Sequence, residues 1–267
     1  MINLCIFTGT FRTGGAENLI IHIINNLDRT KYNIYIAAFS DKGELHQRYK
    51  NLEVEIHLFP KGILSFKSIY RYAKFLKQKK IQTIHINLTG TFLFAVPIAK
   101  LMRVKNIVIH WHNVYNYNPD LPKMHYQNIL ARININYLSK LSDSIIAISK
   151  AVKNNNCKIF HVNKEKVKVI YNAIDFSVIP TNDSKYQNRD NFIIGSIGKI
   201  SKQKGFDTLI KAFSVVTKTH SNCRLEIVGA IPEEEYCNNV LALPEKFSIS
   251  DKVIFTGVLP YNEVYKR

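Results

Sequence analysis

The chain has 267 residues, of which 46% are hydrophobic, and its 37 Lys and Arg outnumber its 20 Asp and Glu to give a formal net charge of +17. This length allows one large domain or two ordinary ones, and the apolar content excludes an intrinsically disordered chain. The longest apolar run, Phe92 to Ala99, contains Pro97 and ends at Lys100, so it is far too short to span a membrane.

Apolar, strand-like runs alternate with helix-like stretches over residues 1–178. One of the helix-like stretches is Gly15–Leu27, which has an apolar face. Strands that are apolar on both sides and separated by helices indicate a parallel sheet covered on both faces. The predicted strands are Asn3–Thr8, Ile34–Phe39, Val54–Phe59, Thr83–Asn87, Asn106–Trp111, Ser144–Ile148 and Val167–Tyr171. We therefore expect a first Rossmann-like domain over residues 1–178.

A glycine-rich turn, Thr8–Glu17, joins the first predicted strand to the first helix and contains Gly14 and Gly15. Glycines let the backbone turn tightly beside a ligand, and free N–H groups at the start of a helix favour an anion. The spacing does not match the dinucleotide fingerprint G-x-G-x-x-G, which argues against hydride transfer. Without other evidence, an ordinary tight turn explains the pair equally well.

Residues 65–80 predict an amphipathic helix with an apolar face and many basic side chains. The apolar side chains are Phe66, Ile69, Ala73 and Leu76, and the basic ones are Lys67, Arg71, Lys74, Lys77, Lys79 and Lys80. This pattern is typical of a helix that docks on an anionic membrane surface. An ordinary solvated helix face is the alternative.

Residues 175–191 change in character, with Pro180 followed by a polar run and no periodicity, and we interpret residues 179–191 as a linker. The alternation then restarts in a second domain, 192–267. Its predicted strands are Phe192–Ile197, Arg224–Val228 and Lys252–Phe255, and its predicted helices are Phe206–Thr219 and Glu233–Phe247. Another helix begins at Tyr261, so we expect this second doubly wound domain to be incomplete.

The loop Gly195–Asp207 leads from the first strand of the second domain to a helix and carries Lys199 and Lys204. Two ammonium groups beside a helix N-terminus suit a diphosphate, whose negative charge they offset as a nucleoside diphosphate leaves. Solvated lysines in a surface loop are the alternative.

Five short motifs in this order resemble retaining glycosyltransferases of family 4, which have the GT-B fold. They are Gly14-Gly15-Ala16-Glu17, Asn172-Ala173-Ile174-Asp175, Gly198-Lys199 with Lys204-Gly205, Leu225-Glu226-Ile227-Val228-Gly229 and Val253-Ile254-Phe255-Thr256-Gly257. The resemblance covers nearly the whole chain. It implies an α/β GT-B-like architecture of two Rossmann-like domains with catalysis in the cleft between them.

The resemblance also implies roles for individual residues. Lys199 and Lys204 would bind the diphosphate of the nucleotide-sugar, and Gly14 and Gly15 would lie near the donor phosphates or the acceptor. The histidine that hydrogen-bonds the donor sugar is best matched by His112, in the run Ile107–Asn113. Strand alternation puts His110 on the same side, so it remains a contender. Further candidates are Asn113, Gly198 and Asn172.

Two departures from the family pattern are visible. The family has Arg where this chain has Lys199, so the charge is kept but bidentate geometry is lost. The acidic motif of the family would lie after Val253–Gly257, and ten residues follow Gly257. We therefore expect a chain truncated at the C-terminus, with transferase activity near background and a sheet left open beside the strand that ends at Gly257.

The predicted activity is transfer of a sugar from a nucleoside-diphosphate-sugar, a UDP- or GDP-sugar, to a hydroxyl of a glycan or lipid-linked acceptor. By analogy with the family, the product would be a bacterial surface polysaccharide such as lipopolysaccharide O-antigen or capsule. No metal ion or other cofactor is implied, because the chain has no Asp-x-Asp motif and lysines can supply the positive charge. The alternatives are a sugar-nucleotide epimerase of the same fold and an inactive remnant that binds only nucleotide or membrane.

The excess positive charge lies in the first domain. Residues 1–178 hold 25 Lys and Arg against 10 Asp and Glu, whereas residues 179–267 hold 12 against 10. No nucleic-acid recognition module accompanies the charge, so we expect an anionic membrane surface rather than nucleic acid as partner. The start of the chain reads as a buried strand, and the four scattered cysteines form no zinc-binding pair. We expect a cytoplasmic protein, peripheral on the inner face of the cell membrane.

Overall fold

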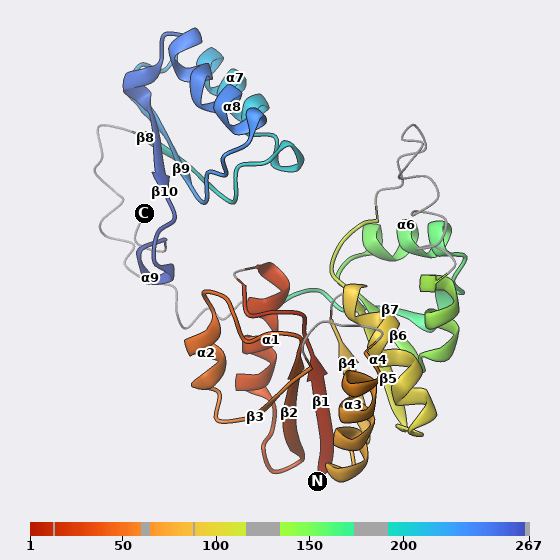
Figure 1. Ribbon diagram of the computed structural model, residues 1–267. Helices are drawn as coiled ribbons and strands as arrows, with labels where there is room; N and C mark the ends of the chain where they lie inside the picture. The colour runs from red at the N-terminus through yellow and green to blue at the C-terminus, as the bar shows by residue number, and fades with distance from the viewer. Residues whose placement is uncertain (13, 60–64, 88, 116–133, 174–191, 265–267) are drawn as a thin grey trace. The chain divides into compact units, whose positions relative to one another are not determined.

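The computed structural model describes residues 1–12, 14–59, 65–87, 89–115, 134–173 and 192–264. The chain divides into two compact units, Met1–Ile174 and Asp175–Arg267. The linker predicted at 179–191 lies outside the described residues. Both units contain parallel sheets with helical connections, which confirms the predicted α/β class (Figure 1).

Unit 1 is built on a seven-stranded parallel sheet with the order β3-β2-β1-β4-β5-β6-β7. The order reverses between β1 and β4, and in such sheets ligands bind beyond the carboxyl ends of the strands at the reversal. The strands are β1 (Ile2–Phe7), β2 (Tyr32–Ala38), β3 (Glu55–Leu58), β4 (Thr83–Ile86), β5 (Asn106–Trp111), β6 (Ser144–Ala147) and β7 (Val167–Val169). All seven fall on predicted runs.

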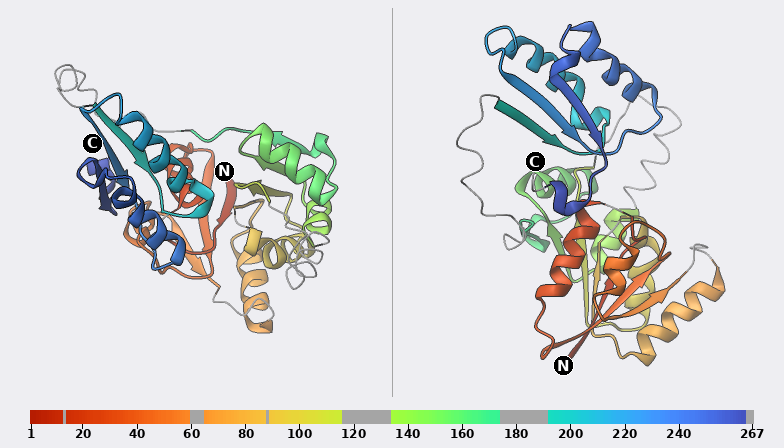
Figure 2. Two further views of the ribbon diagram at one scale, coloured as in Figure 1. Left: turned by 90° about the horizontal axis from the view of Figure 1, so that it is seen from above. Right: turned by 90° about the vertical axis from the view of Figure 1, so that its left-hand side faces the viewer.

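Helices cover both faces of this sheet, because right-handed crossovers change face where the strand order reverses (Figures 1 and 2). One core lies beneath α1 (Gly15–Asn26) and α2 (His46–Lys50), where Ile6, Ile20 and Tyr49 are fully buried. The other core lies beneath the remaining helices of unit 1 and is rich in aromatic side chains. These helices are α3 (Phe66–Gln78), α4 (Thr89–Leu101), residues 134–141 and α6 (Lys150–Phe160), which the 3-10 turn η1 (Lys164–Lys166) follows.

The long apolar run of the sequence lies in α4, where Phe94, Ala95 and Val96 are buried in the core of unit 1. This burial explains the run without a bilayer. Within the described residues, no helix is both long enough and apolar enough to cross a membrane.

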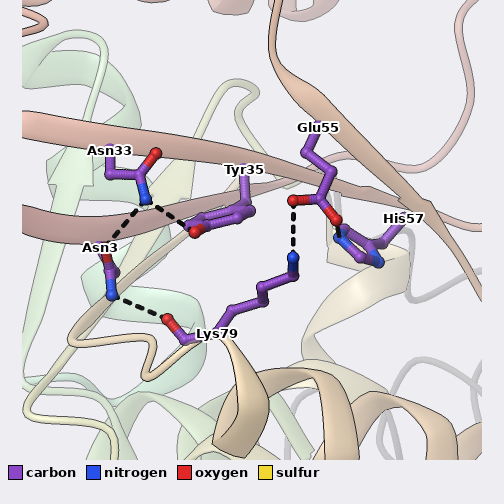
Figure 3. A network of polar contacts seen from close by, with 6 residues as sticks. All are labelled: Asn3, Asn33, Tyr35, Glu55, His57 and Lys79. Carbon is purple, nitrogen blue, oxygen red and sulfur yellow. Dashed lines mark hydrogen bonds and ion pairs between the residues drawn. The ribbon is translucent and has the colours of Figure 1, made fainter.

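A polar network ties the C-terminus of α3 to the amino-terminal edge of the sheet (Figure 3). Asn3 Nδ2 donates to the carbonyl of Lys79 at 2.8 Å, and Asn33 Nδ2 donates to Asn3 Oδ1 at 3.2 Å. Lys79 Nζ forms an ion pair with Glu55 Oε2 at 2.8 Å. These contacts lie at the edge where the strands begin, so they support the fold and leave the carboxyl edge free for a site.

Unit 2 contains a three-stranded parallel sheet with the order β10-β9-β8. Phe206, Ile210 and Leu225 are buried in its core. The strands are β8 (Phe192–Ile197), β9 (Cys223–Val228) and β10 (Val253–Gly257). The other elements are α7 (Phe206–Val216), α8 (Glu235–Lys246), α9 (Tyr261–Val264) and the 3-10 turns η4 (Lys202–Lys204) and η5 (Ser250–Lys252). Because the strands follow one another in one direction, α7 and α8 cover the same face (Figure 2).

The sequence predicts an open side of the sheet beside the strand that ends at Gly257, which is β10. That strand is an edge, but it is the less exposed of the two edge strands. In the described sheet β8 and β10 are both edges, and β8 is exposed along nearly its whole length. Phe192 and Ile197 of β8 are 70% and 68% exposed. The reason is the winding order: the chain moves outward from β8 to β10, so the far side of β8 has no partner strand among the described residues.

Candidate functional site

The candidate site of unit 1 lies at the carboxyl ends of β4 and β5, next to the reversal of strand order. Both strands are rich in β-branched residues, and alternation gives them two different faces. Ile84, Ile86 and Ile109 point into the aromatic-rich core and are fully buried. His85 and His110 therefore point to the other face of the sheet.

Three imidazoles gather there. His85 Nε2 and His110 Nδ1 are 3.1 Å apart, a hydrogen-bonding distance, and the ring centroids of His110 and His112 are 4.1 Å apart. The sequence predicts that His110 and His112 lie on the same side of the strand, and the short distance between their rings confirms this. His112 Nε2 lies 3.2 Å from Asn87 Oδ1, just beyond the end of β4. Within the described part of the chain, His110 Nε2 and His112 Nδ1 are buried without a hydrogen-bond partner.

Burial keeps this cluster uncharged at neutral pH. Desolvation lowers the pKa of His85 to about 4, with a further contribution from His112. It also lowers the pKa of His112 to about 4. For His110, desolvation and the two neighbouring imidazoles lower the pKa to about 2. Neutral imidazoles can donate and accept hydrogen bonds, but they provide no cation for a phosphate.

The three rings do not form a metal site: in the ranges that the structure describes, no group of three or more His, Cys, Asp or Glu is arranged to hold a metal ion. The cluster can act through hydrogen bonds to neutral groups.

A cavity of about 80 Å³ borders the cluster, and Asn87, His112 and Phe160 are among its lining residues. Asn156 of α6 also lines this cavity and is 2% exposed. The Asn156 amide accepts from the Tyr115 N–H at 2.9 Å and donates to the Asn113 carbonyl at 3.0 Å. The segment after β5 is therefore held against α6 by a buried side chain.

Gly14 and Gly15 lie at the start of α1, beyond the carboxyl end of β1. Gly14 is the N-cap in extended conformation, and the helix has no side-chain cap hydrogen bond. A Cβ on Gly14 would collide with the carboxylate of Glu17, whereas a Cβ on Gly15 would meet no atom within 4 Å. Because the Glu17 side chain can turn away and Gly14 has extended backbone, local packing requires glycine at neither position.

In unit 2, Lys199 and Lys204 lie in the loop between β8 and α7. Both are exposed, and Lys199 Nζ lies 3.9 Å from Glu234 Oε1. Lys204 lies in η4, and its ammonium group contacts no acidic or accepting group in the described ranges. Gly205 follows as the N-cap of α7, with φ of +67° and no side-chain cap.

The base of this loop is held by a close backbone approach. A Cβ on Gly229 would collide with the carbonyl of Gly198, so only glycine lets the ends of β8 and β9 come together. The loop that carries the two lysines consequently begins at a fixed point of the sheet.

The structure brings together some of the predicted residues and leaves others apart. His110, His112 and Asn113 lie together at the end of β5, and Gly198, Lys199 and Lys204 share one loop of unit 2. Asn172 is exposed shortly after β7, and its described surroundings give it no role.

Sequence reasoning missed His85, Asn87 and Asn156. The available signal was two polar side chains at alternate positions of an apolar strand, His85 and Asn87.

Comparisons with known proteins agree with this geometry. Residues 13–178 match the model of the family described as Glycosyltransferase Family 4, and residues 178–267 match that of Glycosyl transferases group 1. An uncharacterized glycosyltransferase of Haemophilus influenzae is 25% identical over 249 residues, which cover 91% of this chain. This chain spans 65% of the length of that relative.

A second relative, from Campylobacter jejuni, is 24% identical over 267 residues, 96% of this chain and 70% of its own. It is named N-acetylgalactosamine-N,N'-diacetylbacillosaminyl-diphospho-undecaprenol 4-alpha-N-acetylgalactosaminyltransferase. Among solved structures, Anabaena Alr3699/HepE in complex with UDP superposes with a TM-score of 0.78 at 19% identity, covering 99% of this chain and 71% of that one. At this identity the structural likeness establishes the GT-B-like fold.

Proposed function

The chain belongs to glycosyltransferase family 4, and from this premise we propose that the protein transfers a sugar from a nucleoside-diphosphate-sugar to a hydroxyl group of an acceptor, with retention of the anomeric configuration. Unit 2 would bind the donor, and the carboxyl edge of the sheet in unit 1 would bind hydroxyl-bearing groups of the substrates.

The lysine loop of unit 2 is the observation that carries the donor half of this proposal. Lys199 precedes η4 and Lys204 is its last residue, directly before Gly205, the uncapped N-terminus of α7. Ammonium groups and free N–H groups at a helix start together favour a diphosphate. The same positive charge would stabilise the nucleoside diphosphate as it leaves, which removes the need for a metal ion. UDP and GDP are the donor nucleotides to test.

The chemistry of unit 1 is complementary to that of the lysine loop. Its imidazoles are neutral, so they are suited to sugar hydroxyls rather than to phosphates. We assign His112 the contact with the transferred sugar, and His110 lies behind it in the cluster. Gly15 offers open backbone at the carboxyl end of β1, and the Glu17 carboxylate lies against Gly14.

The acceptor that best fits these observations is a glycan on a lipid carrier. The Campylobacter relative is named for a diphospho-undecaprenol-linked substrate. A peripheral position on the inner face of the cell membrane would bring such an acceptor within reach, and the basic surface of unit 1 supports it. Synthesis of a surface polysaccharide, such as O-antigen or capsule, is the corresponding role.

An acceptor-dependence assay tests the proposal. Labelled UDP- and GDP-sugars are incubated with lipid-linked acceptor glycans, using this chain and, in parallel, the full-length Haemophilus relative. Label on the acceptor is the expected result, and the product's anomeric configuration then tests retention. Conversion of the donor without an acceptor would identify an epimerase instead. Nucleotide binding with no turnover in this chain would favour a binding remnant.

A further inference from the structure

The amide of Asn87 is held in one orientation at the end of β4. Its side chain is 1% exposed, and its backbone N–H donates to the carbonyl of Phe7 at 3.1 Å. Its Nδ2 donates to the carbonyl of His85 at 3.2 Å. Because a carbonyl oxygen only accepts hydrogen bonds, the NH₂ group must face His85 and Oδ1 must face the other way.

Oδ1 of Asn87 then determines which nitrogen of His112 carries the proton. The two atoms Asn87 Oδ1 and His112 Nε2 are 3.2 Å apart, and Oδ1 can only accept. Nε2 is therefore the donor. The ring has a single N–H at neutral pH, since burial lowers the pKa of His112 to about 4. Nδ1 is left with a free lone pair.

No donor satisfies this lone pair within the described ranges, and His112 Nδ1 is buried. A buried acceptor without a partner costs free energy, and a ligand that donates to it supplies the missing bond. His112 also lines the cavity at the end of β5. A hydroxyl can donate to Nδ1, whereas an ionised phosphate or carboxylate can only accept.

We propose that Asn87 is a positioning residue that fixes His112 as the Nε2–H tautomer, so that Nδ1 accepts a hydrogen bond from a hydroxyl of the bound sugar. The identity of the hydroxyl-bearing ligand rests on the proposed function; the tautomer does not. The control position is Asn106, whose amide donates to Thr83 Oγ1 at 3.2 Å and joins the same two strands at their opposite ends.

The tautomer can be read by NMR on the whole chain with ¹⁵N-labelled histidine, using His112→Gln for assignment. We expect a protonated Nε2 and an unprotonated Nδ1 for His112 at pH 7. Exchange of the Nε2 proton with solvent should be at least tenfold faster in Asn87→Leu. It should stay slow in Asn87→Asp, which keeps an accepting oxygen, and in Asn106→Ala. A protonated Nδ1 in the unmodified protein, or unchanged exchange in folded Asn87→Leu, would overturn the proposal.

The hydroxyl is tested separately with UDP-glucose and UDP-N-acetylglucosamine as probes. Binding that moves the Nδ1 resonance of His112 supports the assignment, and binding that leaves this resonance unmoved contradicts it. Absence of any binding would count against the proposed donor, while the tautomer and exchange measurements still decide the role of Asn87.

Discussion

At the scale of single residues, the imidazole cluster combines burial with unsatisfied hydrogen-bonding capacity. His110 is 5% exposed, and the pKa of all three histidines is lowered chiefly by burial. A sheet edge that served only as structure would fill these positions with apolar side chains at lower cost. The cluster is therefore best understood as a site whose neutral, polar character is maintained by the fold.

The lowered pKa values predict an acid-sensitive unit 1. In the unfolded chain these histidines titrate near pH 6.5, so below that pH the unfolded state binds protons that the folded state rejects. Stability is thus fully present above about pH 6.5 and is lost as the pH falls towards 4, where His85 and His112 titrate in the fold. Each unit of pKa difference corresponds to about 1.4 kcal/mol.

Urea denaturation at pH 7 and pH 4.5, followed by the fluorescence of Trp111, the single tryptophan, checks this prediction. His110→Gln should reduce the loss of stability between the two pH values by about 1–3 kcal/mol, because it removes the most shifted group. His22→Gln, on α1 and outside the cluster, is the control. An equal loss in His110→Gln and in the unmodified protein would contradict the account.

At the scale of elements, the amphipathic helix predicted over residues 65–80 is confirmed as α3. The predicted apolar face contacts the protein's own core: Leu76 is buried, and Ile69 and Ala73 pack against the aromatic-rich cluster. Lys79 is paired with Glu55 and is not free for lipid headgroups. The surface of α3 instead presents Phe66 and Tyr70, which are 89% and 67% exposed. Four exposed basic residues accompany them: Lys67, Arg71, Lys74 and Lys77.

This mixed aromatic and basic surface predicts binding to anionic membranes, with the two rings inserted and the basic groups on headgroups. Sedimentation with phosphatidylserine-containing vesicles should fall as salt shortens the screening length. Phe66→Ser with Tyr70→Ser, and separately Lys67→Glu with Lys74→Glu, should each weaken binding several-fold. Lys150→Glu with Lys158→Glu, at two exposed positions of α6, makes the same charge change elsewhere in unit 1 and should have a smaller effect. Equal binding to neutral and to anionic vesicles would contradict an electrostatic contribution to membrane binding.

At the scale of the whole molecule, helices cover the sheets of the two units to different degrees. The sheet of unit 1 has helices on both faces, whereas α7 and α8 cover one face of the sheet in unit 2. On the other face of unit 2, Ile193 and Ile254 are each 37% exposed. Exposed apolar surface and an unpaired strand lower local stability and favour association.

Hydrogen exchange should report this difference. Amides of β8 should exchange faster than those of β9, which has a partner strand on both sides, and unit 2 should exchange faster than the central strands of unit 1. Ile197→Lys should raise solubility without unfolding unit 2, whereas Ile227→Lys, at a position 1% exposed, should unfold it. Equal protection of β8 and β9 would show that β8 is covered.

The sequence predicts the order and type of these elements well, because buried parallel strands leave continuous apolar runs and the glycine turns separate them clearly. It predicts the site less completely. His112 could be chosen from the resemblance to the family, but its partner Asn87 is 25 residues away in sequence and becomes a neighbour only through the β4–β5 register. The exposed edge of unit 2 also depends on strand order, which periodicity does not encode.

The central claim is that the lysine loop of unit 2 binds the diphosphate of a sugar nucleotide, and calorimetric titration of the folded chain with UDP and GDP tests it most directly. We predict saturable binding of at least one nucleotide. Lys204→Ala should weaken it by about 1.5–3 kcal/mol, the range for a hydrogen bond to a charged group. Lys199→Ala should also weaken it, and Lys202→Ala, on the same 3-10 turn, should not. Absence of binding to both nucleotides would contradict the account. So would the same nucleotide affinity in Lys199→Ala, Lys202→Ala and Lys204→Ala.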